Sequence, residues 1–296
     1  GLANTVSSSS TPESKYSLSF DGAADYVEIN DTGFTSLLST NDDFSISIWF
    51  KGGAQTDSTA GNMLLGFFDS SGDNVLRIGV DGRDSKSIFY KAAGGNADFG
   101  VINLEDDEWH NLIISGVQGT TAFFVDGSAL LDGSDSAETS AEDPPWDDVA
   151  RILIGADLDG TTINDFFEGE IAQISMWSEN LDANDIASVY NGGRPINVTY
   201  NRGTYDKSAN LIGFWQMGNG SFDDKANGVI HDQHAPGFEA DLIAANGGLV
   251  NSFSGNFTHS GGLMTVTADE NQNWNGGNVE ALTVYKATVD IVSGAT

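Results

Sequence analysis

The segment FSISIWF (44–50) sets the expected architecture, because apolar and smaller polar residues alternate along most of its length. In a β-strand, successive side chains point to opposite faces, so an alternation with a period of two predicts one core face and one outer face. The predicted core face contains Phe44, Ile46, Ile48 and Phe50, and the predicted outer face contains Ser45, Ser47 and Trp49. The segment therefore predicts a strand of a layered β-structure.

Strand-like segments continue on both sides of this one. They span residues 16–29, 62–68, 75–80, 108–116, 121–131, 151–157 and 166–177. Asp-Gly pairs at 81–82 and 126–127 are typical of tight hairpin turns. Residues 181–193 are the one convincing amphipathic helix, with Asp182 near its start and two glycines at its end. This order predicts an all-β, two-sheet sandwich with one short helix.

The domain organisation follows from where the strand pattern changes. Residues 1–15 are polar and are expected to form a leader or linker, while residues 16–247 form the sandwich, completed by a strand at 211–217. Residues 248–296 carry two predicted strands, Leu263–Ala268 and Leu282–Val292. Because a stable sheet needs at least three strands with a covered face, this segment is predicted to be the start of a second β-rich module or an assembly arm.

Composition excludes several classes of function. The chain has 43 acidic and 12 basic residues, a formal net charge of −31, and no cysteine. Nucleic acid is not an expected partner, because its binding depends on basic side chains that neutralise phosphates. Thiol catalysis is impossible without cysteine. No apolar run reaches the roughly 20 residues that a membrane-spanning helix needs, so no membrane insertion is expected.

Four stretches of the chain resemble the laminin-G-like branch of the concanavalin-A-like lectin/glucanase superfamily. They are SLSFDGAADYVEI (17–29), FSISIWFK (44–51), DDEWHNLIISGVQGTTAFFVDG (106–127) and FEGEIAQISMWSENLDANDIASVYNGG (167–193). The resemblance implies a concanavalin-A-like jelly-roll sandwich, in which Trp109 and His110 serve packing. Residues 248–296 resemble the opening half of a galactose-binding-like jelly roll. The segment LIGFWQMGNGSFDD (211–224) is similar to one in structural proteins of marine tailed phages.

Glucanases of the superfamily that the chain resembles place their catalytic carboxylates on one strand, in the pattern E-x-D-x-E or a close variant. The chain has only EDDE (105–108) and EGE (168–170), neither of which fits that pattern. A serine-nucleophile elbow, an H-E-x-x-H zinc motif and a glycine-rich phosphate loop are also missing from the sequence. The two histidines of HDQH (231–234) are expected to be neighbours in a loop by chance rather than to bind a metal. The sequence therefore predicts a protein that is not an enzyme.

Calcium is the candidate cofactor, because it binds hard oxygen ligands that loops supply. Asp157, Asp159, Asn164 and Asp165 crowd one inter-strand loop, and Asp21 and Asp25 of the turn FDGAAD, with the segment SSGDN (70–74), are secondary candidates. The resemblance implies a further metal ligand after the G-x-I of the late strand. That position is Ala172 here, which departs from the family pattern.

Glycan binding requires exposed aromatic side chains beside polar groups. Trp146 and Trp274 lie in polar loops and are the candidate glycan-binding residues, whereas Trp49, Trp177 and Trp215 lie in strands and are expected to pack.

Three functions remain open. The preferred one is a non-catalytic virion surface module (decoration, fibre or adhesion) that binds glycans or neighbouring virion subunits, as a homo-oligomer or within a larger assembly. The alternatives are a secreted bacterial lectin-like adhesin or carbohydrate-binding module, and a glycan-degrading enzyme. The expected location is the virion surface or the extracellular space.

Overall fold

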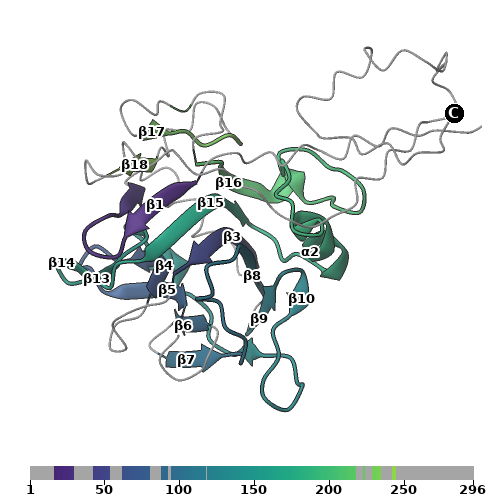
Figure 1. Ribbon diagram of the computed structural model, residues 1–296, viewed down its shortest axis with the longest axis horizontal. Helices are drawn as coiled ribbons and strands as arrows, with labels where there is room; N and C mark the ends of the chain where they lie inside the picture. Colours follow the sequence, from purple (N-terminus) through teal and green to yellow (C-terminus); the bar gives the residue numbers. More distant parts are fainter. Residues whose placement is uncertain are drawn as a thin grey trace, which may run out of the picture.

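A computed structural model describes residues 17–29, 43–53, 62–80, 88–92, 95–117, 119–217, 223, 229–234 and 242–244. Within these residues the chain forms two antiparallel sheets packed face to face, with one α-helix beside the first sheet (Figure 1). The prediction of a two-sheet β-sandwich with one helix is confirmed. The predicted strands at 263–268 and 282–292, and the whole segment 248–296, lie outside the described residues.

The first sheet has the strand order β1-β15-β3-β8-β9-β10, with β16 also paired to β15 and β11 also paired to β9. Its strands, in chain order, are β1 (Leu18–Asp21), β3 (Phe44–Gly52), β8 (His110–Val117), β9 (Thr120–Val125), β10 (Ser128–Ala129), β11 (Thr139–Ser140), β15 (Glu168–Trp177) and β16 (Leu211–Trp215). The predicted strand at 211–217 therefore does complete the sandwich, as β16.

The second sheet has the order β17-β18-β2-β12-β4-β5-β6-β7. Its strands, in chain order, are β2 (Val27–Ile29), β4 (Asn62–Phe68), β5 (Asn74–Val80), β6 (Ile88–Ala92), β7 (Gly95–Phe99), β12 (Arg151–Ile154), β17 (Val229–Ile230) and β18 (Leu242–Ala244). A separate hairpin joins β13 (Asp157–Asp159) to β14 (Thr162–Asn164), and two short 3-10 helices, η1 (Trp146–Asp148) and η2 (Ser208–Asn210), lie in connections.

The core lies between the two sheets, and β3 shows why the sequence folds this way. Its predicted core face does enter the main cluster of buried apolar side chains, where it meets Ile152 and Ile154 of the opposite sheet. Its outer face is buried as well, because the helix and the chain that follows it cover that side of the first sheet. Burial on both faces means that β3 is a central strand of a three-layered region.

Two predicted strands are each divided. The segment 16–29 forms β1 in the first sheet and β2 in the second, since the chain turns at Gly22, whose φ is +70°. The segment 151–157 breaks at Gly155, whose φ is +81°, before it continues as β13. A positive φ is inexpensive only for glycine, so each glycine marks a change of direction. The predicted turn at 126–127 is present, with positive φ at both residues, while the one at 81–82 lies outside the described residues.

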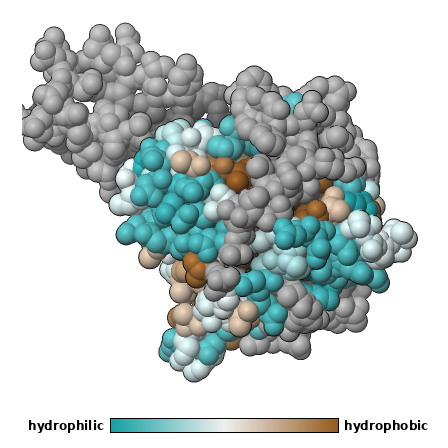
Figure 2. Space-filling view, turned by 180° about the vertical axis from the view of Figure 1, so that it is seen from behind, coloured by the Kyte–Doolittle hydropathy of each residue, from teal (hydrophilic) through white to brown (hydrophobic). Residues whose placement is uncertain are grey.

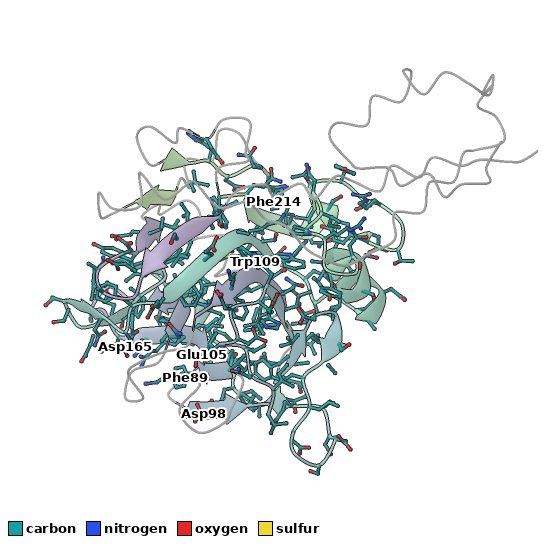
Figure 3. The ribbon with its side chains drawn as sticks, viewed as in Figure 1. Phe89, Asp98, Glu105, Trp109, Asp165 and Phe214 are labelled. Carbon is teal, nitrogen blue, oxygen red and sulfur yellow. The ribbon has the colours of Figure 1, made fainter. Side chains whose placement is uncertain are left out.

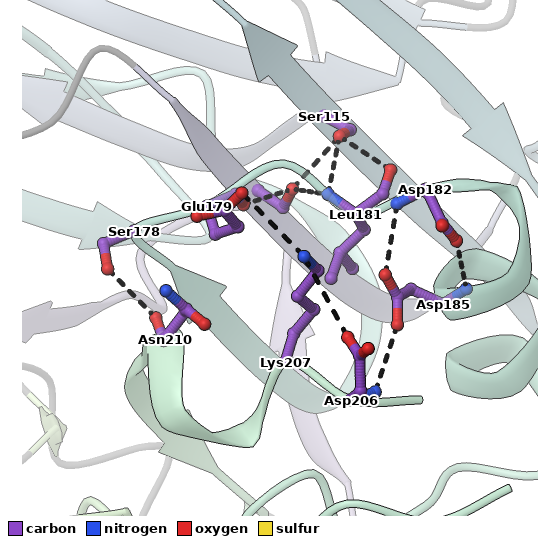
Figure 4. A network of polar contacts seen from close by, with 10 residues as sticks. Ser115, Ser178, Glu179, Leu181, Asp182, Asp185, Asp206, Lys207 and Asn210 are labelled. Atoms are coloured by element: carbon purple, nitrogen blue, oxygen red, sulfur yellow. Dashed lines mark hydrogen bonds and ion pairs between the residues drawn. The ribbon is translucent and has the colours of Figure 1, made fainter. Parts of the chain in front are cut away.

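Helix α2 (Ala183–Tyr190) is fixed to the first sheet through a polar network (Figure 4). The backbone N–H of Leu181 donates to the hydroxyls of Ser45, at 2.9 Å, and Ser115, at 3.0 Å. Asp182 then caps the helix by accepting from two backbone N–H groups, while the Asp185 side chain accepts from the N–H of Asp182. This reciprocal arrangement is a capping box. None of the helices among the described residues is long and apolar enough to cross a membrane.

Candidate functional site

The acidic loop that was predicted to bind a metal forms the β13–β14 hairpin, which packs against the second sheet. Leu158 and Ile163 of the hairpin join Phe68, Leu153 and Tyr26 in a small apolar cluster on that sheet. Asp157 and Asn164 are directly paired across the hairpin. The hairpin thus buries one face and leaves Asp157 and Asn164 beside strand β5. We call these two residues, with Arg77 and Asp165, the hairpin site.

The hairpin site is built around Arg77 of β5. Its guanidinium contacts the carboxylate of Asp157 directly and lies 3.5 Å from Oδ2 of Asp165. The side chain of Asp157 is only 4% exposed, and burial raises its pKa to about 6, although the charge of Arg77 opposes that rise. Desolvation disfavours a charged carboxylate, whereas a neighbouring cation favours it. Sequence reasoning found the acidic residues of this site but did not find Arg77.

The other predicted metal ligands are used differently. Asp159 is exposed at the end of β13, opposite Thr162. Asp21 accepts hydrogen bonds from the backbone N–H groups of Ala23, Ala24 and Asp25, and these bonds hold the pKa of its carboxyl below the usual range despite some desolvation. Asp21 therefore shapes the turn between β1 and β2. Among the described residues, no three or more His, Cys, Asp or Glu side chains are arranged to hold a metal ion.

The prediction that Trp146 is an exposed sugar platform is wrong. Trp146 is only 7% exposed, and its ring meets Phe44 at a centroid distance of 5.0 Å and Phe67 at 5.3 Å, both edge to face. The acidic loop around it folds back so that 3-10 helix η1 inserts the indole between the two sheets. Trp274, the other predicted platform, lies outside the described residues.

A different aromatic cluster lies on the outer face of the first sheet, and we call it the aromatic face. Trp49 and Ala172 are buried there, and the partly exposed Trp109 and Tyr190 pack against them. Trp49 and Tyr190 are stacked, with ring centroids 5.9 Å apart and an interplanar angle of 13°. Figure 3 shows Trp109 over the strands of the first sheet, apart from Asp165 and Phe89 near the hairpin site. The carboxylate expected in the family at the position of Ala172 would be buried beneath these rings.

Charged side chains border the aromatic face. Lys51 Nζ lies 3.0 Å from Asp107 Oδ1 and 3.8 Å from Glu170 Oε1, and Glu170 also accepts from the hydroxyl of Ser17. Lys51 and Glu170 are directly paired on β3 and β15. Glu170, which belongs to the EGE segment weighed for catalysis, is thus held in an ion pair. The face combines aromatic rings with hydrogen-bonding groups at its edge.

His110 is the first residue of β8, where it is paired with Phe50 of β3. Its Nδ1 lies 2.8 Å from Asp126 Oδ2 and its Nε2 lies 3.1 Å from Asp106 Oδ1. Burial lowers the pKa of His110, but the two carboxylates outweigh that effect, and the net shift is upward from 6.5. The expected structural role of His110 agrees with this geometry.

The pKa of His110 predicts how stability depends on pH. A histidine whose pKa is raised on folding stabilises the protein fully below about pH 6.5, and this contribution is lost as the pH rises through the folded-state value. We therefore expect the free energy of unfolding to fall across this window in the wild type and to fall less in His110→Gln. Denaturant titrations at about pH 6 and pH 8 measure the difference. Equal pH dependence in both proteins would contradict the assignment.

The two antiparallel sheets packed face to face define a two-sheet β-sandwich. The family model of the concanavalin A-like lectin/glucanases superfamily matches residues 21–187, more than half of the chain, and the chain therefore belongs to this family. None of the curated proteins compared with the chain matches it.

Several solved structures are similar. A carbohydrate-binding protein described as putative, from Bacteroides ovatus, has a TM-score of 0.51 and 13% identity, with 78% of this chain and 57% of that chain covered. A heptameric SAP-like pentraxin from Limulus polyphemus has a TM-score of 0.48 and 17% identity, covering 63% and 87%. The CBM40 module of a Ruminococcus gnavus IT-sialidase, bound to α2,3-sialyllactose, has a TM-score of 0.48 and 13% identity, covering 61% and 100%. At these identities the likeness concerns the fold.

Proposed function

We propose that the chain is a non-catalytic glycan-binding module and that it binds sugar rings on the aromatic face. The observation that carries this proposal is the partly exposed Trp109, which packs beside the Trp49–Tyr190 stack and above the buried Ala172. Sugar rings bind proteins by laying an apolar face on an aromatic ring while polar groups around it fix their orientation. The ion-paired Lys51, Asp107 and Glu170 supply such groups at the edge.

The charge of this region favours neutral glycans. Asp107 and Glu170 flank Lys51, and the charge of Asp126 adds to burial in raising the pKa of Tyr190, so three carboxylates accompany one lysine at this face. The whole chain also carries a net charge of −31. Like charges raise the free energy of association, so sialylated or sulfated sugars are expected to bind less well than neutral ones. The preference for neutral sugars is part of the proposal.

A glycan array tests the proposal with three proteins, namely the wild type, Trp109→Ala and Tyr200→Ala. Tyr200 is a matched control, because it is an exposed aromatic residue (47%) that is not part of the aromatic face. We expect the wild type to bind neutral glycans and Trp109→Ala to lose about 30-fold or more in affinity, the effect of removing an aromatic hot spot worth about 2 kcal/mol. Tyr200→Ala should bind like the wild type.

Two results would overturn this assignment. The first is wild-type affinity in Trp109→Ala, and the second is an equal loss in Tyr200→Ala. Hydrolysis of any glycan on the panel would instead support the alternative that the protein is an enzyme. The carboxylates of the EGE segment in β15 would then be the candidate catalytic groups.

The biological setting of the module is a further part of the proposal. The resemblance of residues 211–224 to phage structural proteins and the acidic composition support a virion surface protein that attaches to glycans or to neighbouring subunits. The coloured part of the surface in Figure 2 is mainly hydrophilic, with small separate hydrophobic areas, as expected for residues that face solvent. Recovery of the protein with purified particles supports this setting, and recovery only in a secreted fraction would favour the bacterial adhesin.

A further inference from the structure

The hairpin site contains the oxygen ligands of a cation site. Its carboxylates come from Asp157 and Asp165, and two of its oxygens, Oδ1 of Asp157 and Oδ1 of Asn164, are buried with no hydrogen-bond partner among the described residues. Carboxylate and amide oxygens on adjacent loops are the donors that Ca²⁺ prefers. Buried oxygens with no partner are uncommon, so this donor set indicates a site adapted to positive charge.

A cation that belongs to the chain already contacts both carboxylates. Arg77 is 16% exposed in its side chain, contacts Asp157 directly and lies 3.5 Å from Asp165. Its Cζ lies over the Phe89 ring, 5.3 Å from the ring centroid, in a cation–π contact. A planar guanidinium suits this combination of carboxylates and an aromatic ring better than a hydrated ammonium does.

The surrounding backbone holds the donors around Arg77. Gly72, in the turn between β4 and β5, lies so close to Gly160 of the β13–β14 turn that an added Cβ would stand 1.9 Å from the Gly160 oxygen. Asp165 follows β14 with a left-handed φ of 47°, which is costly for a residue other than glycine. These two turns keep the hairpin against β5, so loss of Arg77 would leave the buried Asp157 carboxylate without its cation.

We propose that Arg77 is the resident cation of the hairpin site and takes the place that a calcium ion would otherwise fill. The sandwich then keeps its acidic hairpin in place without calcium, and the residues around Arg77 do not fit a bound metal while the guanidinium is there. This inference is independent of glycan binding. Under this proposal, the predicted calcium site at Asp157, Asp159, Asn164 and Asp165 holds a guanidinium that contacts two of its carboxylates.

Thermal unfolding of the full chain, in EDTA and in millimolar CaCl₂, tests the proposal. The variants are Arg77→Met, which removes the charge and keeps much of the apolar stem, and Arg151→Met as the matched control. Arg151 lies on β12 of the same sheet, and its Nε is 2.8 Å from Oε1 of Glu28, so its ion pair is with a carboxylate outside the hairpin site. Calcium that binds elsewhere on the chain would shift all three proteins alike, so the difference from the wild type isolates this site.

We expect Arg77→Met to be destabilised in EDTA and to gain about 5 °C or more in Tm on calcium addition, beyond any shift of the wild type. Arg151→Met should show no such gain, and Asp157→Asn added to Arg77→Met should abolish it. If Arg77→Met does not fold in EDTA, its refolding yield with calcium is the readout, and recovery in calcium is the expected result.

Three outcomes would overturn the proposal. One is an equal response of Arg77→Met and the wild type to calcium, and another is failure of calcium to restore folding to Arg77→Met. The third is a wild-type response to calcium that Asp157→Asn removes, since calcium would then bind with Arg77 in place.

Discussion

Replacing Trp146 by alanine is expected to lower the free energy of unfolding by about 3–5 kcal/mol, the usual cost of removing a large aromatic side chain from a core. The indole is 7% exposed and lies edge to face with Phe44 and Phe67, so its removal leaves a cavity between the two sheets. Urea or guanidinium titration followed by far-UV circular dichroism measures the loss.

Trp146→Phe is the control, because it retains an aromatic ring and should lose markedly less stability. Unchanged stability in Trp146→Ala, together with loss of glycan binding, would instead support the sequence prediction that Trp146 is an exposed glycan-binding residue. The variant therefore separates packing from binding at a residue that the sequence alone misplaces.

Replacing Gly72 by alanine is expected to cost about 2–5 kcal/mol, which combines the cost of a left-handed residue with that of overpacking. The φ of Gly72 is +83°, and an added Cβ would collide with the Gly160 backbone. Because backbone cannot move aside as a long side chain can, the β4–β5 turn and the β13–β14 hairpin would have to separate.

Gly119→Ala is a matched control for this prediction. Its φ of +76° is similar, but a Cβ there would meet nothing within 4 Å. The free energy of unfolding of Gly119→Ala should fall by only about 1–2 kcal/mol, the cost of a left-handed conformation for alanine. Equal losses in the two variants would show that the contact between the two turns contributes nothing.

The order of the elements was predictable because local patterns encode it. The alternation in 44–50 predicted both faces of β3, and Asp182 together with the apolar stripe predicted helix α2. Strands β6 and β7 were missed because IFYKA and GNADF lack a clear alternation and are surrounded by polar residues. The divided strands were missed because Gly22 and Gly155 reverse the chain without interrupting the apolar pattern.

The candidate sites were harder to predict because they depend on contacts between distant segments. Polarity of the neighbouring residues suggested that Trp146 was exposed, yet the fold of its loop decides its burial. Arg77 and Asp157 are far apart in the chain, and only the packing of the hairpin on β5 brings them together. The aromatic face likewise joins β3, β8, β15 and α2, and its most informative residue, Trp109, precedes β8 in a segment that indicated only packing.

The central claim is that glycans bind on the aromatic face, and the indole N–H signals of the six tryptophans test it most directly. Each signal is assigned by the loss of one peak in a Trp→Phe variant, and the wild type is then titrated with neutral hexaoses of glucose, mannose and galactose. We predict that at least one sugar shifts the Trp109 signal, while the signals of the buried Trp146, Trp177 and Trp215 stay in place. A shift confined to Trp274, or binding that leaves the Trp109 signal unchanged, would contradict the account.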